Sequence, residues 1–65
     1  MNFETPVDEQ CYIEAIEGLK HFDGEYIIKM AKLLDEELKT NAELRKVFEE
    51  YPYKRTMYLF KICDS

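Results

Sequence analysis

Residues that turn or break a chain are scarce in this sequence, which has two glycines and two prolines among 65 residues. Sandwiches and barrels join many short strands through turns whose geometry glycine and proline supply. So few of these residues argue against a many-stranded fold. The apolar residues recur at helical spacing instead, and we predict an all-α fold, a single small domain of three to four helices spanning residues 1–65.

The clearest helix start is Thr5-Pro6-Val7-Asp8. Thr5 can cap the first free amides, Pro6 suits the first helical position, and Asp8 suits the positive end of the helix dipole. Apolar residues from Cys11 to Leu19 then share one arc, with the charged residues outside it. This pattern predicts an amphipathic helix over about residues 6–20.

Two further helices follow: one over about residues 24–39, and one that starts after Thr40 and ends at about residue 50. Asp23 is placed to cap the first of them. Thr40 and Glu43 have the spacing of a capping box, which would begin the next helix, and Pro52 would end it. The connection is so short that one bent helix is the alternative to two separate helices.

Residues 53–63 fit two structures. The aromatic and branched side chains suit a strand, whereas Tyr53, Met57, Phe60 and Cys63 align on one side of a helix. A lone strand needs a partner to pair with, and only residues 1–5 are free to provide one. We favour a fourth helix, with a short strand as the alternative.

Composition and charge narrow the class of protein. Hydrophobic residues make up 46% of the chain, too many for intrinsic disorder. No apolar run is long enough to span a membrane, and the start lacks the basic and apolar segments of a signal peptide, so we expect a cytoplasmic protein. The net charge of −5 includes seven acids and one lysine within the first 25 residues. Direct binding to nucleic acid is not expected without a dominant basic surface.

Catalytic and metal sites find little support, and we predict neither an enzyme nor a cofactor. Cys11 and Cys63 have the character of small apolar core thiols. His21 is the single histidine, placed to interact with the end of the first helix. One histidine without a close cysteine pair cannot complete a closed zinc site. No phosphate-binding, metalloprotease or calcium-loop motif is present.

Surplus surface groups point to protein binding instead. The first helix carries acids on its polar side, while Ile13 and Ile28 lie outside the apolar arcs of their helices, and the last segment crowds aromatic residues beside basic ones. Such aromatic residues are favoured at the centres of interfaces. The candidate partner-binding residues are Glu9, Ile13, Glu14, Glu17, Ile28, Tyr53, Lys54, Arg55, Tyr58 and Phe60.

These features lead to two hypotheses. The first is a small acidic regulator, an inhibitor that occludes a basic surface of another protein, such as a nucleic-acid-binding protein or nuclease. Small acidic proteins of this kind serve in conflicts between phages and their hosts. The second is a structural or auxiliary subunit that forms a homodimer, because a chain this short buries little surface alone.

Overall fold

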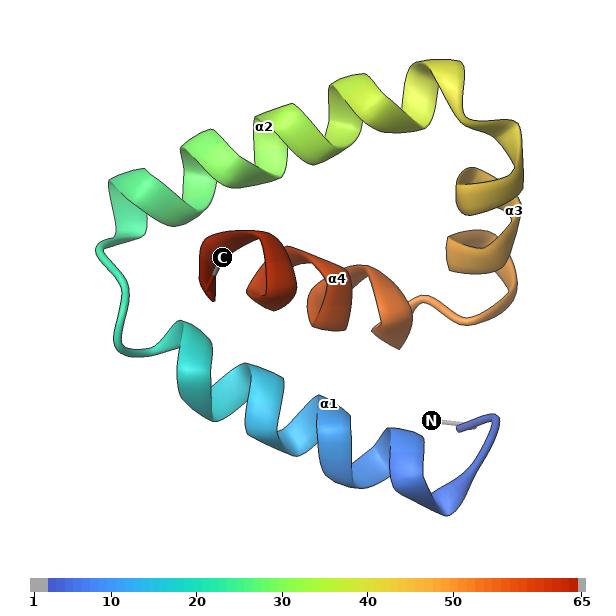
Figure 1. Ribbon diagram of the computed structural model, residues 1–65, viewed down its shortest axis with the longest axis horizontal. Helices are drawn as coiled ribbons and strands as arrows, with labels where there is room; N and C mark the ends of the chain where they lie inside the picture. The colour runs from blue at the N-terminus through green and yellow to red at the C-terminus, as the bar shows by residue number, and fades with distance from the viewer. Residues whose placement is uncertain (1–2, 65) are drawn as a thin grey trace.

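The computed structural model describes residues 3–64, which form four helices joined by short turns (Figure 1). No residue of this range lies in a strand. The predicted all-α fold is therefore confirmed, with the larger of the two expected numbers of helices. In chain order the helices are α1 (Pro6–Leu19), α2 (Gly24–Thr40), α3 (Ala42–Glu50) and α4 (Tyr53–Asp64).

The helix starts follow local capping chemistry. Thr5 accepts a hydrogen bond from the Asp8 amide at 3.2 Å and Pro6 opens α1, as predicted. Asp23 occupies the position before α2, but its side chain makes no capping hydrogen bond. The helix therefore begins after an extended residue, Asp23, without a hydrogen bond from the side chain of that residue.

The boundary between α2 and α3 corrects the predicted capping box. Thr40 is still helical, and its hydroxyl donates to the Glu37 carbonyl at 3.2 Å. Asn41 is the residue that leaves helical geometry, with φ −115° and ψ 89°, and its side chain accepts from the Leu44 amide at 3.0 Å. A residue can cap a helix only from outside it, so Asn41 takes the role assigned to Thr40. The chain turns sharply at this residue, and α2 and α3 are separate helices.

The last segment is a helix, and it lies at the centre of the molecule. Figure 1 shows α4 between α1 on one side and α2 on the other, with α3 closing one end. Contacts with all three neighbours explain why this segment is helical: the side chains of α4 pack against α1, α2 and α3. The core consists of Leu34 from α2, Phe48 from α3, and Leu59 and Cys63 from α4.

The arrangement is flat, measuring 30 × 29 × 18 Å along its principal axes. Three helices placed around one central helix leave furrows where α4 meets its neighbours, and these furrows position the candidate site. Within residues 3–64, no helix combines the length and the apolar character needed to cross a membrane.

Candidate protein-binding surface

The outer side of α1 presents an isoleucine surrounded by acids. Ile13 is 48% exposed. Glu9 and Glu17 lie one helical turn before and after it, and Glu14 is its neighbour in sequence. All three glutamates are exposed, because the opposite side of α1, around the buried Ala15, packs against α4. We call Glu9, Ile13, Glu14 and Glu17 the acidic face.

Few of the carboxylates of the acidic face are paired with a positive charge of the same chain. Within the described range, Glu9 and Glu14 have no ion-pair partner. The Glu17 carboxylate lies 3.2 Å from the Lys20 ammonium, but both side chains are about two-thirds exposed. Solvent screens such a pair, so it contributes little to stability and can exchange for a partner's charge.

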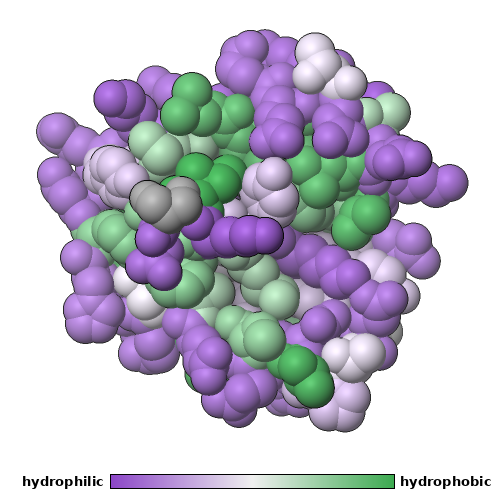
Figure 2. Space-filling view, viewed as in Figure 1, coloured by the Kyte–Doolittle hydropathy of each residue, from purple (hydrophilic) through white to green (hydrophobic). Residues whose placement is uncertain are grey.

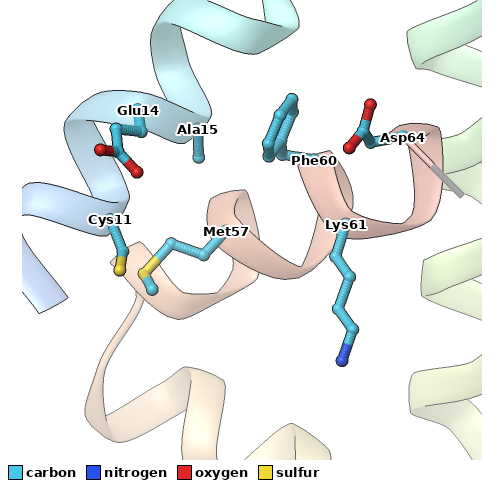
Figure 3. A pocket seen from close by; sticks show the side chains of 7 residues that line it. All are labelled: Cys11, Glu14, Ala15, Met57, Phe60, Lys61 and Asp64. Atoms are coloured by element: carbon cyan, nitrogen blue, oxygen red, sulfur yellow. The ribbon is translucent and has the colours of Figure 1, made fainter.

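A groove between α1 and α4 begins where the acidic face ends. It has a volume of about 480 Å³ and shares Glu14 with the acidic face. Figure 3 shows side chains from the two helices converging on it. The residues that line the groove are Cys11, Glu14, Ala15, Met57, Phe60, Lys61 and Asp64. We call it the α1–α4 groove.

The interior of this groove is apolar and its rim is charged. In Figure 3, the sulfur atoms of Cys11 and Met57 lie near each other, and the Phe60 ring lies beside Ala15. The carboxylates of Glu14 and Asp64 stand at separate places on the rim. The Lys61 side chain extends away from both carboxylates.

Phe60 is held in place by a contact with a glycine. A Cβ atom added to Gly18 would lie 2.2 Å from Cε1 of the Phe60 ring. The ring therefore occupies the space that any other residue at position 18 would fill. On another side, the Phe22 ring meets it edge to face, with the centroids 6.4 Å apart. Phe60 is half-buried and reaches the groove, which agrees with its selection as a partner-binding candidate but does not test that role.

Tyr53, another of the partner-binding candidates, is buried in the structure. It is only 2% exposed, and its ring packs against Phe3 with the centroids 4.7 Å apart. Its hydroxyl donates to Asp8 Oδ2 at 2.7 Å and accepts from the Glu4 amide at 2.9 Å. Burial raises the pKa of this hydroxyl. Tyr53 therefore joins the N-terminal segment to α4 and offers nothing to a partner.

Basic residues of the tail are largely engaged within the chain. Lys54 forms an ion pair with Glu4, and this hydrogen bond raises the pKa of its ammonium. Arg55 donates to Asp35 Oδ1 at 2.6 Å. These contacts reduce the basic rim that the sequence suggested beside the aromatic residues. Both ion pairs are partly exposed to solvent, which weakens them, so a charged group of a partner protein can compete with them.

The two remaining candidates lie apart from the acidic face. Tyr58 is half-buried, and its ring meets Phe48 edge to face with the centroids 5.8 Å apart. Ile28 is 58% exposed on α2, which lies on the other side of α4 from α1. The predicted set therefore divides: Glu14 and Phe60 line the α1–α4 groove, whereas Lys54 and Tyr58 line a second groove between α3 and α4.

Sequence reasoning missed several residues of this groove, among them Met57, Lys61 and Asp64. The signal that could have found them is weak: Met57 and Lys61 are four residues apart in α4, so they share one side of the helix. A second groove of about 420 Å³ runs along the other side of these residues, between α3 and α4. Its lining is Asp8, Leu44, Val47, Phe48, Lys54, Met57, Tyr58 and Lys61.

The groups that could support catalysis or metal binding are dispersed. Cys63 is buried in the core, where loss of solvent raises the pKa of its thiol, and Cys11 is a half-buried thiol in the groove. Both cysteines are free. His21 is exposed in the turn after α1. Within residues 3–64, no three potential metal ligands of the His, Cys, Asp and Glu types form a group.

Apolar surface is distributed in patches. Figure 2 shows green apolar groups separated by purple charged groups over the face in view, instead of one continuous apolar area. The chain matches no protein-family model, and neither a curated protein nor a solved structure shows significant similarity to it.

Proposed function

We propose that this protein is a non-enzymatic regulator that binds a basic surface of another protein and inhibits it by occlusion. The observation that carries the proposal is the acidic face: an exposed Ile13 among three exposed glutamates on one rigid helix. An apolar anchor within a rim of charge is the usual anatomy of an interface.

The mechanism follows from charge placement. Carboxylates held at helical spacing can occupy arginines and lysines that would otherwise hold phosphate groups, for example in a nucleic-acid-binding protein or nuclease. The net charge of −5 also accelerates encounter with a basic partner at moderate ionic strength. The helix is already formed, so binding pays little for ordering it.

The test uses two variants of equal net charge. In one, Glu9, Glu14 and Glu17 are replaced by glutamine; in the other, the three exposed glutamates of α3, Glu43, Glu49 and Glu50, are replaced in the same way. Each variant is immobilised and exposed to an extract of the cells in which the protein occurs, at low and at high salt. The captured protein is then identified and purified for titration.

We expect the α1 variant to bind the purified partner between about threefold and about 150-fold more weakly, since each of three exposed pairs contributes about 0.2–1 kcal/mol. The α3 variant should retain its affinity to within about twofold. The partner, once purified, should also lose its nucleic-acid binding when the native protein is added. Equal effects of the two variants would show that net charge matters and the acidic face does not.

The second candidate function is assembly through self-association, and one observation favours it. Leu33 is 54% exposed and Tyr26 36% exposed, two turns apart on the same side of α2. Such a stripe could pair with a second copy. Light scattering over a range of concentrations tests this: a dimer that Leu33→Lys abolishes, with no effect of the acidic-face variant, would support assembly over inhibition.

A further inference from the structure

The α1–α4 groove joins two unpaired carboxylates to an apolar interior. Over residues 3–64, neither Glu14 nor Asp64 has a side-chain hydrogen bond or an ion pair. Between them lie apolar groups, including Ala15, Met57 and Phe60. A ligand that fits must therefore combine an apolar part with a positive charge.

We propose that this groove receives an arginine side chain from a basic segment of the partner protein, an inference that rests on the proposed function. The aliphatic stem of arginine lies over the apolar groups, as such stems do on protein surfaces. Its planar guanidinium carries donors in a fixed fork that matches a carboxylate, and either Glu14 or Asp64 can accept from it. Because Glu14 also belongs to the acidic face, one partner can contact both surfaces at once.

Lys61 is the group that opposes a cation here. It lines the same groove, but its side chain extends away from the Glu14 and Asp64 carboxylates (Figure 3). The rim thus carries two negative charges and one positive charge, and the balance favours a cation. Lys61 therefore weakens binding, and its removal should strengthen it.

The neighbouring α3–α4 groove has the wrong charge for this role. Its only acid, Asp8, accepts a hydrogen bond from the Tyr53 hydroxyl, while Lys54 and Lys61 are both on its lining. An arginine would meet two ammonium groups there. The two grooves share Met57, but Ala15 lines only the first and Leu44 only the second.

The test is a nuclear magnetic resonance titration of the labelled protein with a short synthetic peptide. The peptide has a central arginine flanked by leucines, with lysines at its ends. Its matched control replaces the arginine by citrulline, which keeps the shape and removes the charge. The amide of Ala15 reports on the α1–α4 groove and the Leu44 amide on the α3–α4 groove, whereas the methyl group of Met57 reports on both.

We expect the arginine peptide to shift Met57 and Ala15 and to leave Leu44 unchanged, with at least threefold weaker binding of the citrulline peptide. Glu14→Gln and Asp64→Asn should each weaken binding about two- to fivefold, and Lys61→Gln should strengthen it by a similar factor. Glu43→Gln on α3 changes the net charge by the same amount and should have less effect than Glu14→Gln.

Three results would overturn the inference. Shifts restricted to Glu9, Ile13 and Glu17 would place the peptide on the acidic face alone, and the proposed function would stand without the groove. Shifts at Leu44 that become larger when the basic residues of the peptide are replaced by acidic ones would assign binding to the α3–α4 groove. Absence of any shift would also reject arginine recognition, whereas the proposed function fails only if the partner assay shows no role for the acidic face.

Discussion

Gly18 and Gly24 should respond to alanine in opposite directions. Alanine normally stabilises a helix interior by about 1 kcal/mol relative to glycine. At Gly18, however, the new Cβ would lie 2.2 Å and 2.5 Å from two carbons of the Phe60 ring. Carbon atoms pack at about 3.5–4.0 Å, so the ring must retreat by more than 1 Å. Overpacking of this kind costs about 1–3 kcal/mol, which offsets the helix-propensity gain, and we expect a net loss of up to about 2 kcal/mol for Gly18→Ala.

Thermal unfolding followed by circular dichroism measures this loss. For a domain of this size, each kcal/mol lowers the Tm by about 4–8 °C, so the Tm of Gly18→Ala should lie below that of the native protein by up to about 16 °C. Gly24 begins α2 with no atom within 4 Å of an added Cβ, and Gly24→Ala should be neutral or raise the Tm. Phe60→Leu should reduce the penalty of Gly18→Ala when the two are combined. A Gly18→Ala protein that is more stable than the native one by about 1 kcal/mol, as for an unhindered helix position, would refute the close packing of Phe60 on α1.

Three further predictions concern the core and the buried titratable groups. Leu34→Ala should cost about 2–5 kcal/mol in chemical denaturation because Leu34 is fully buried, whereas Leu33→Ala, at a site 54% exposed, should cost under about 1 kcal/mol. Alkaline pH should destabilise the protein: the pKa of Tyr53 is raised in the folded state, so the unfolded chain loses that proton first and stability falls as pH rises above about 10. Tyr53→Phe should flatten this part of the pH profile while lowering stability at neutral pH. Iodoacetamide should modify Cys11 faster than Cys63, which is buried and has a raised pKa, and mass spectrometry of the peptides would detect equal rates if this were wrong.

Much of the fold was predictable because its signals are local. The first helix is set by Thr5 and Pro6 together with one apolar arc, and the structure confirms all of these. The start of α3 was placed one residue early because Thr40 and Asn41 are both good caps, and the sequence alone does not say which leaves helical geometry. Exposure of Ile13 and Ile28 followed correctly from their positions outside the apolar arcs.

Tertiary contacts between distant segments were beyond sequence reasoning. Tyr53 is buried by Phe3 and hydrogen-bonded to Asp8, residues 50 and 45 positions away along the chain. Nothing in the local pattern distinguishes this tyrosine from one at the surface. Similarly, the fourth segment is helical because α4 has three helices around it, and its own side chains suit a strand nearly as well.

The way the fold uses its aromatic residues bears on where a partner can bind. The tail looked like the source of anchors because four aromatic side chains crowd residues 51–60. The packing of α4 against three neighbouring helices accounts for most of these aromatic side chains: Tyr53 is buried, and Tyr58 and Phe60 are half-buried. The outer side of α1 is not packed in this way, because α1 contacts α4 through its inner side, where Ala15 is buried. Within the described residues, Glu9 and Glu14 have no ion-pair partner and Glu17 pairs only with the exposed Lys20, so the acidic face contributes little to the fold. Phe60 is the aromatic residue of the tail that lines the α1–α4 groove together with Glu14.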